Sequence, residues 1–157
     1  MLASRLLLIG DGPEMSGVRR QVDQAGLADQ VEFLGHVDNL ENVLPVADLL
    51  LLPSLHESFG LVALEAMACG VIPLVTDRGG AGEFIQDGLN GILRDPEDIE
   101  GMVQAAVKVL QDDRLRLEMA EEARRDAAGD FGVSCVVKNY LDLYDRLLAT
   151  PPDLTGG

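Results

Sequence analysis

Short apolar runs and amphipathic stretches alternate along the first two thirds of the chain. The apolar runs predict buried strands at residues 5–10, 30–35, 48–53, 71–76 and 90–94. Helical spacing of apolar residues predicts helices at 14–25, 39–47 and 59–70, a single turn at 83–86, and three more helices at 97–110, 113–128 and 134–148. This order predicts an α/β fold, a Rossmann-like parallel sheet with helices on both faces.

The segment 56–70, HESFGLVALEAMACG, carries the strongest pattern. Its helix is apolar on nearly every side, which predicts burial, and Glu65 sits in the middle of it, where a carboxylate needs a partner. Gly60 lets a ligand approach the start of the helix, whose first N–H groups suit an anion. Glu57 precedes it. Together these features indicate a site for a polyhydroxyl ligand that carries phosphate, and a nucleotide sugar is the simplest such ligand.

Ligands of parallel α/β sheets bind beyond the carboxyl ends of the strands. Four loops follow predicted strands, and all are rich in glycine or short polar residues: 10–13, 35–38, 53–58 and 77–82. We therefore expect them to converge on one crevice. Gly10 and Gly12 match two glycines of a dinucleotide fingerprint, but Met15 stands where another glycine is required. This favours a tight turn beside a ligand.

Each candidate residue also has a plainer interpretation. Glu65 is either the acceptor of two ribose hydroxyls or a partly exposed or internally paired helix residue. Glu57 is either a sugar contact or a solvated acid, and Gly79-Gly80 either presents N–H groups to phosphate or forms an ordinary turn. His36 and His56 lack a visible nucleophile or metal partner, which favours surface or loop-stabilising roles over base catalysis.

Composition limits the class of protein. With 157 residues and 47% hydrophobic residues the chain can build a core, so residues 1–148 are expected to form one domain. The motif at 56–70 makes this a nucleotide-sugar-binding domain, and because the chain opens almost at once on a core strand, the domain is expected to be truncated on its N-terminal side. Residues 149–157, with two prolines and a Gly-Gly end, are expected to be a disordered tail. The net charge of −15 argues against nucleic acid and anionic membrane as partners.

Cysteine use and hydropathy indicate a compartment. Cys69 and Cys135 lie far apart in no metal or redox spacing, which predicts free thiols in a reducing environment. No signal peptide and no apolar run of membrane-spanning length is visible. A cytoplasmic protein without a transmembrane segment is therefore expected.

Several motifs agree in order and spacing with one enzyme family. Glu57 and Glu65 are separated by seven residues inside ESFGLVALEAMACG, and GDGPE (10–14), VEFLG (31–35), ADLLLLPS (47–54) and DRGG (77–80) accompany them. In these motifs, over residues 5–148, the chain resembles the family 4 retaining glycosyltransferases of the GT-B fold. The resemblance implies that it is the C-terminal, donor-binding domain of such an enzyme.

The resemblance also implies residue roles. Glu65 holds the ribose hydroxyls, and Glu57 contacts hydroxyls of the donor sugar as the catalytic residue of this chain, though not as a nucleophile. The backbone at Phe59, Gly60 and Leu61 binds diphosphate and sugar, and the loop at His36-Val37 meets the base through main-chain groups. Ser58, Gly10 and Gly12 complete the expected substrate-binding set.

The rest of the machinery is expected outside this chain. A diphosphate site usually has cations as well as amides, and the inner loops here supply almost none. In the resembling family an Arg and a Lys from upstream stabilise the leaving diphosphate, the acceptor binds mostly to an N-terminal domain, and no bound metal or other cofactor is used. The fragment alone is therefore expected to bind a nucleotide sugar without catalysing transfer.

The wording FLGHVDN and ESFGLVALEAMACGV is most similar to the bacillithiol-pathway branch of the family. That likeness implies transfer of N-acetylglucosamine from UDP to L-malate. Three alternatives stay open: a transferase with another donor, such as GDP-mannose, and a lipid or glycan acceptor; a nucleotide-sugar epimerase; and a non-enzymatic α/β interaction module.

Overall fold

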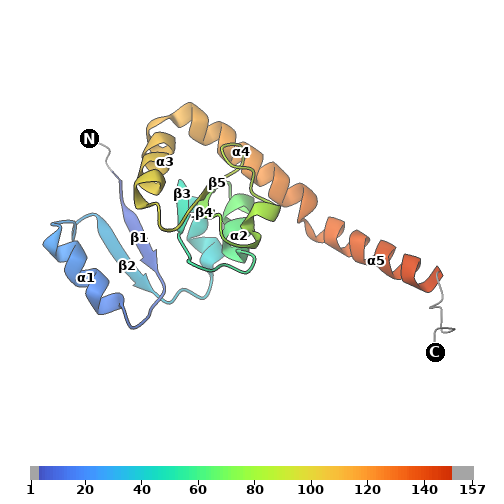
Figure 1. Ribbon diagram of the computed structural model, residues 1–157, viewed down its shortest axis with the longest axis horizontal. Coiled ribbons are helices and arrows are strands. Elements are labelled where there is room, and N and C mark those ends of the chain that lie inside the picture. The colour runs from blue at the N-terminus through green and yellow to red at the C-terminus, as the bar shows by residue number, and fades with distance from the viewer. Residues whose placement is uncertain (1–3, 150–157) are drawn as a thin grey trace. The chain divides into compact units, whose positions relative to one another are not determined.

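The computed structural model describes residues 4–149 and divides into two compact units, which meet in the sequence between Val43 and Leu44 (Figure 1). Unit 1 contains β1 (Leu6–Ile9), α1 (Met15–Gln24), β2 (Val31–Gly35) and a 3-10 turn, η1 (Leu40–Asn42). Unit 2 contains the remaining elements: η2 (Leu44–Val46), β3 (Leu49–Leu52), α2 (Leu61–Ala68), β4 (Ile72–Thr76), η3 (Gly80–Glu83), β5 (Ile92–Arg94), α3 (Ile99–Gln111), α4 (Asp113–Asp130) and α5 (Val133–Ala149).

Unit 1 is a parallel strand pair joined by a helix. β1 and β2 pair with Leu6 opposite Val31, and α1 connects them. Arg19 of α1 places its guanidinium 4.1 Å from the ring centre of Phe33 on β2, a cation–π contact. No side chain between residues 4 and 43 is fully buried. Taken by itself, this unit has no closed core.

Unit 2 is built on a three-stranded parallel sheet in the order β3-β4-β5. Leu51 of β3 lies opposite Leu74 of β4, which in turn lies opposite Ile92 of β5. All five residues of the central strand β4 are buried. A strand that is apolar on both sides needs cover on both faces of its sheet.

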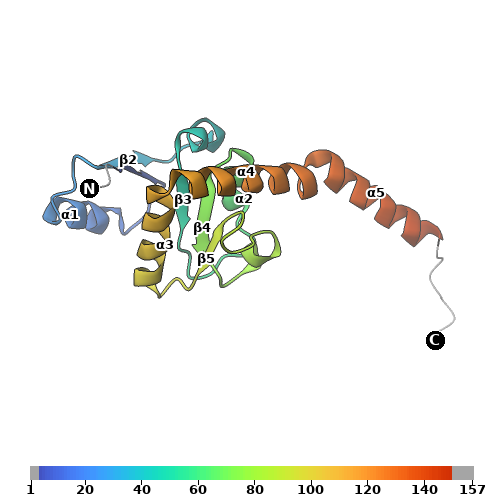
Figure 2. The same ribbon diagram turned by 90° about the horizontal axis from the view of Figure 1, so that it is seen from above.

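Helices provide that cover on both faces (Figure 2). Val75 packs with Ala63 and Met67 of α2 and with residues from the C-terminal half of α4. Ile72 and Leu74, which point to the opposite face, pack with residues of α3 and with Met119 in the N-terminal half of α4. The helix α4 therefore contributes to both layers.

These findings confirm the predicted α/β class, with parallel strands and with helices on both faces of the sheet in unit 2. The described strands form two sheets, one in each unit, where a single sheet was predicted. Apolar runs identify strands but carry no information on which strands pair. The extent of the nucleotide-sugar-binding domain, predicted as 1–148, stays a prediction.

Two boundary predictions are wrong. The helix expected at 39–47 is instead two 3-10 turns, because Pro45 lacks the N–H that a continuous α-helix would bond to the Glu41 carbonyl. The turn expected at 83–86 lies three residues earlier, at η3. Of the expected tail, Ala149 is the last residue of α5, and residues 150–157 lie outside the described part.

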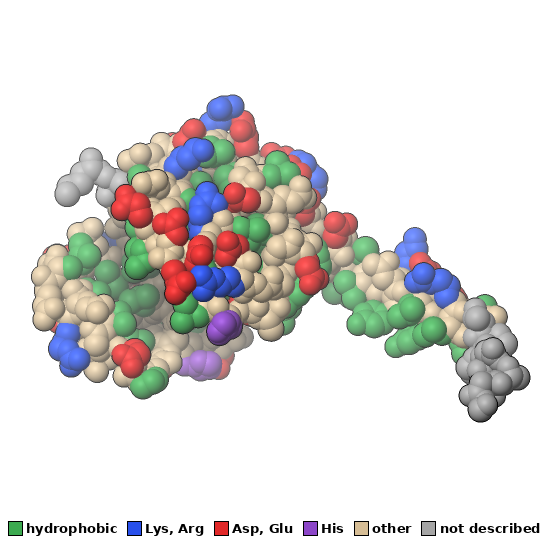
Figure 3. All heavy atoms as spheres, viewed as in Figure 1, with side chains coloured by type: hydrophobic (Ala, Val, Ile, Leu, Met, Phe, Trp, Pro, Cys, Tyr) green, Lys and Arg blue, Asp and Glu red, His purple; other side chains and the backbone are tan. Residues whose placement is uncertain are grey.

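The helix α5 presents its apolar side chains to solvent. Leu147, Tyr140 and Val133 are more than half exposed, and apolar side chains line this helix in Figure 3. No residue of α5 is fully buried. Within residues 4–149, no helix combines the length and apolar character that crossing a membrane requires.

Candidate donor-binding site

The loop between β3 and α2 places a carboxylate over the start of a helix. Gly60 precedes α2 with φ 87°, a left-handed backbone conformation that glycine adopts without strain. It is buried, and a Cβ added to it would lie 3.5 Å from Cγ of Glu57 and 3.9 Å from Cζ of Phe84. The Glu57 side chain therefore packs beside the first turn of α2. The structure thus brings Glu57 and Gly60 together, as predicted.

The amide groups at this helix start are partly uncommitted. Gly60 accepts bonds from the N–H groups of Ala63 and Leu64 at 2.8 and 3.3 Å. The N–H groups of Leu61 and Val62 have no backbone acceptor within residues 4–149. Such groups, at the positive end of the helix, favour a bound anion.

The loop after β4 packs directly against this segment. The backbones of Glu57 and Gly79 form a β-bridge, and the N–H of Gly80 donates to the carbonyl of Ser58 at 3.2 Å. A Cβ on Gly79 would overlap the Glu57 carbonyl oxygen, and one on Gly80 would overlap that of Ser58. The pair Gly79-Gly80 therefore permits backbone-to-backbone packing. Because the Gly80 N–H is already bonded, it is not free for a phosphate.

The prediction that Glu65 is buried is wrong. Ala63, Ala66 and Met67 turn into the core, whereas Glu65 is exposed. Leu61, 65% exposed, and Ala68 lie on the same side of α2, at positions i and i+7 of one helical stripe that includes Glu65 at i+4. Since two apolar residues of this stripe face solvent, the composition of the helix could not distinguish its exposed side.

Arg78 joins the loop after β4 to the loop after β5. Its Nη2 donates to both oxygens of Asp95, at 2.8 and 3.0 Å, and to Oε2 of Glu97 at 2.6 Å. These bonds to Glu97 and Asp95 raise the pKa of Arg78. The pKa of Asp95 is lowered, first by the hydrogen bond from the Glu97 backbone and then by Arg78. The guanidinium is therefore neutralised by two carboxylates.

A second arginine at the carboxyl end of the sheet is also committed. Nη1 of Arg94, the last residue of β5, donates to Asp87 at 2.9 Å. Neither arginine offers a charge that is free of a carboxylate partner. A diphosphate bound at α2 would thus rely on helix amides within this part of the molecule.

In unit 1 the loops after β1 and β2 meet. The N–H of Gly10 donates to the carbonyl of Gly35 at 2.7 Å, next to His36 and Val37. The N–H of Gly12 is bonded to the Asp11 side chain at 2.8 Å. The predicted loops therefore come together in pairs, one pair in each unit, and the substrate roles of the unit 1 residues stay predictions.

The histidines are surface groups, as their plainer interpretation predicted. The side chain of His36 is 81% exposed and contacts Asp38 at 3.1 Å. His56 is exposed as well.

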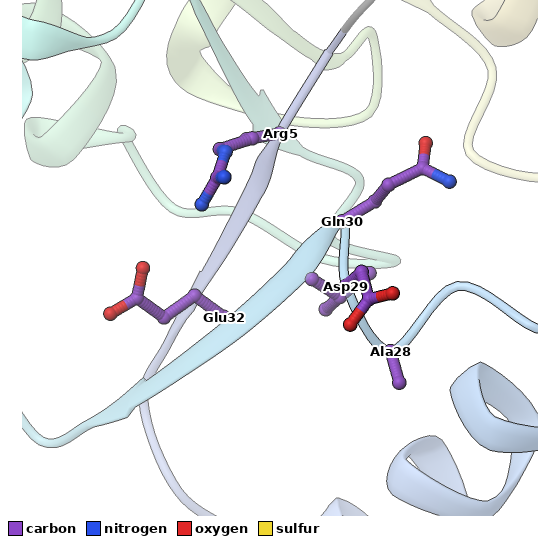
Figure 4. A pocket seen from close by; sticks show the side chains of 6 residues that line it. Arg5, Ala28, Asp29, Gln30 and Glu32 are labelled. Carbon is purple, nitrogen blue, oxygen red and sulfur yellow. The ribbon is translucent and has the colours of Figure 1, made fainter.

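Two surface hollows lie away from the predicted residues. One, of about 190 Å³, is lined by six residues near the amino ends of β1 and β2: Arg5, Ala28, Asp29, Gln30, Val31 and Glu32 (Figure 4). The other lies along the polar side of α5, between Asn139 and Arg146. The first is at the end of the strand pair opposite Gly10 and Gly35, where parallel sheets do not bind ligands.

Asp95 and Glu97 are site residues that were not predicted from the sequence. They follow β5 directly, and the rule that selected four loops at strand ends also applies to this fifth loop. The signal was therefore present in the sequence.

Comparison with known proteins decides the family. The family described as Glycosyl transferases group 1 matches residues 3–126. The chain belongs to this glycosyltransferase family. The match includes every residue of the candidate site in unit 2.

Two relatives are longer than this chain. An N-acetyl-alpha-D-glucosaminyl L-malate synthase of Bacillus anthracis is 42% identical over 145 residues, which are 92% of this chain and 38% of that protein. A 2-deoxystreptamine N-acetyl-D-glucosaminyltransferase of Niallia circulans is 33% identical over 142 residues, 89% of this chain and 36% of the relative. The chain therefore spans little more than a third of the length of these relatives.

Solved structures show the same fold. HepE of Anabaena in complex with UDP aligns with a TM-score of 0.85 and 26% identity, covering 92% of this chain and 41% of HepE. The C-terminal domain of a group 1 family protein, LpcC of Francisella tularensis, aligns with a TM-score of 0.75 and 26% identity over 82% of this chain and 70% of that one. These alignments identify the fold as that of a glycosyltransferase C-terminal domain.

Proposed function

We propose that this chain is the donor-binding part of a retaining glycosyltransferase and binds a UDP-sugar. One observation carries the proposal: the backbone-locked loops after β3 and β4 hold Glu57 beside the uncommitted amides at the start of α2, with Glu65 exposed on the same helix. Along the chain, one carboxylate precedes the anion-binding start of the helix and one follows it, and each can accept hydrogen bonds from hydroxyl groups. A nucleotide sugar has hydroxyls on both sides of its diphosphate.

Each residue has a role in this proposal. Glu65 accepts hydrogen bonds from the ribose hydroxyls, which its exposure on α2 leaves reachable. The amides of Leu61 and Val62 stabilise the negative charge that develops on the leaving phosphate. Glu57 contacts hydroxyls of the transferred sugar and fixes its orientation. Phe59 and Ser58 supply backbone to the same surface. In unit 1, Gly10, Gly12, His36 and Val37 are the proposed nucleotide-binding residues.

The donor is proposed to be UDP-N-acetylglucosamine. Two relatives are named for N-acetylglucosaminyl transfer, and the HepE structure holds UDP. L-malate, named in the first relative, is the proposed acceptor. The reaction proceeds without a bound metal, and the cations for the leaving diphosphate and most of the acceptor site come from sequence beyond this chain.

The compartment is proposed to be the cytoplasm. Cys69 and Cys135 are free thiols in the structure, which fits a reducing environment. The proposed bacillithiol-pathway role is consistent with the same compartment.

A calorimetric titration of the chain with UDP, UDP-N-acetylglucosamine and GDP-mannose tests the donor assignment. We expect saturable binding of both uridine ligands and weaker binding of GDP-mannose. Glu65→Ala should weaken UDP binding about tenfold or more, because a carboxylate that accepts two hydroxyls makes charge-assisted bonds. Glu118→Ala, an exposed glutamate on α4, serves as the matched control and should leave binding unchanged.

Two outcomes contradict parts of the proposal. Equal loss in the Glu65 and Glu118 variants would remove Glu65 from the site. If the chain binds none of the three ligands, a version extended upstream is titrated next, and continued absence of binding would overturn the donor-binding function itself.

A further inference from the structure

Arg78 links the loop after β4 to the loop after β5. The loop 77–80 follows β4, and Asp95 and Glu97 follow β5. A single guanidinium makes three hydrogen bonds to the two carboxylates. The Asp95 carboxylate also accepts a hydrogen bond from the Glu97 N–H at 2.9 Å. This bond restricts the movement of the carboxylate to which Arg78 donates.

The near end of the loop is fixed as well. The N–H of Arg78 donates to Oγ1 of the fully buried Thr76 at 3.1 Å, and the N–H of Asp77 donates to the Arg94 carbonyl at 2.9 Å. One residue further along, Gly79 forms the backbone bridge to Glu57. Arg78 thus stands between an anchored strand end and the backbone that carries Glu57.

The backbones of loop 77–80 and segment 57–59 are in tight contact. Gly79 and Gly80 approach the backbone of Glu57 and Ser58 so closely that a Cβ on either would overlap a carbonyl oxygen. A displacement of loop 77–80 must therefore be followed by the segment 57–59 or break the bridge. Packed backbone transmits small shifts because it cannot be compressed.

We propose that Arg78 is a positioning residue for donor-sugar recognition: by joining loop 77–80 to Asp95 and Glu97, it holds the backbone against which Glu57 is placed. This inference rests on the proposed donor-binding function. It assigns to Arg78 no direct contact with the ligand, because its guanidinium is already occupied by two carboxylates. Sugar recognition through Glu57 depends on it, whereas ribose recognition through Glu65 on α2 does not.

The first test needs no ligand. In ¹H–¹⁵N spectra of the chain, Arg78→Ala should shift the amide signals of Ser58, Phe59 and Gly60, although the hydrogen bonds of the guanidinium run to Asp95 and Glu97. Arg114→Ala, which removes another exposed arginine paired with a glutamate, is the control and should leave these signals in place. Unchanged signals at 58–60 in Arg78→Ala overturn the proposal, whether or not the chain binds nucleotides.

The second test separates sugar from nucleotide. Arg78→Ala should raise the dissociation constant for UDP-N-acetylglucosamine about three- to tenfold and that for UDP less than twofold, a range that removal of an exposed but multiply bonded ion network can give. Glu97→Gln should act in the same direction. The double variant should be no worse than Arg78→Ala alone, since both remove one network.

Failure of the two proposals has different signatures. Wild-type chain that binds neither ligand, even when extended upstream, refutes the donor site, and the amide test then still decides the link from Arg78 to 58–60. Wild-type chain that binds both ligands, with equal weakening of UDP and UDP-N-acetylglucosamine in Arg78→Ala, refutes the positioning role alone.

Discussion

Unit 1 and unit 2 both combine parallel strands with helical segments, yet among the residues that the structure describes only unit 2 has a closed core. Its central strand β4 is buried along its whole length, and α2, α3 and α4 cover it from both faces. In unit 1 every described side chain between residues 4 and 43 keeps some exposure. A two-stranded sheet is marginal in water, whereas three strands with helical cover can be stable. A segment can therefore form the strands and helices of an α/β fold without burying them in a closed core.

The difference matters for the candidate site. Glu57, Gly60, Glu65 and Arg78 all belong to the unit that has the core. Glu57 and Gly60 lie between β3 and α2, Glu65 lies on α2, and Arg78 follows β4. The apolar residues packed on the two faces of the sheet hold these elements in place. The position of these residues is thus set by packing within unit 2.

The difference between the two units is tested most strongly by removing one large side chain from each of them. Met67 is fully buried, so Met67→Ala should lower the free energy of unfolding by about 2–5 kcal/mol. Leu8→Ala, at a partly exposed position of β1, should cost clearly less. Urea denaturation followed by circular dichroism measures both. Equal losses would mean that unit 1 contributes as much to stability as unit 2.

One glycine from each unit extends the comparison to backbone packing. Gly79 and Gly10 both have positive φ, 150° and 116°, but only Gly79 has a carbonyl oxygen in the place of a Cβ. Gly79→Ala should therefore cost about 2–4 kcal/mol, from strain and overlap together, and Gly10→Ala only the strain. Thermal unfolding compares the two variants. A Gly10 variant as unstable as the Gly79 variant would contradict the tight loop packing.

Buried polar groups give the next effect in size. The Nδ2 group of Asn90, which is fully buried, donates to the Phe84 carbonyl at 3.0 Å and to Asp126 at 2.7 Å, and its Oδ1 accepts the Gln86 N–H at 2.7 Å. Asn90→Ala leaves these partners unsatisfied and should cost about 1–3 kcal/mol.

The counterpart in unit 1 is Asn39, which is exposed and makes no capping bond. Asn39→Ala should change stability by no more than about 0.5 kcal/mol. A larger cost at Asn39 than at Asn90, measured by urea denaturation, would reverse the assignment of buried polar bonding to unit 2.

The smallest effect is pH-dependent. Because the pKa of Asp95 is lowered in the folded chain, its ionised form adds stability above the pKa of an unfolded Asp, about 4, and this contribution disappears as the pH falls through the lowered value. Asp95→Asn should therefore be less stable than wild type at pH 7, and the gap should narrow towards pH 3. Asn39→Ala, an uncharged substitution at an exposed position of unit 1, is the control, and its effect on stability should be the same at both pH values. A gap for Asp95→Asn that is constant with pH would exclude an ionic origin.

The sequence predicted the positions of the strands and helices better than the contacts between them. All five strands and all but one of the longer helices lie where apolar periodicity placed them, because that periodicity is a local property. The exception, 39–47, fails at Pro45, whose effect is also local but was outweighed by the apolar pattern around it. Pairing of strands into two sheets depends on contacts between distant segments, which periodicity does not contain.

In the candidate site, too, some features follow from local sequence and others depend on contacts between distant segments. Spacing correctly placed Glu57 beside Gly60 at a helix start. It misjudged Glu65, because an apolar Leu61 and Ala68 on the solvent side make an exposed stripe resemble a buried one. The network of Arg78 with Asp95 and Glu97 joins residues 17 and 19 positions apart. Such a contact follows from the parallel order of β4 and β5 and needs the sheet to be known first.

The bridge between Glu57 and Gly79 also has a consequence for the entropy of association. Fixing the backbone of one residue costs roughly 1–2 kcal/mol in conformational freedom, and a binding loop that is disordered before its ligand arrives must lose that freedom during binding. Here the backbone at 57–60 and 79–80 is ordered by folding itself, through main-chain packing. A ligand that binds at this surface therefore encounters a preorganised loop, and its affinity is not reduced by the work of arranging it.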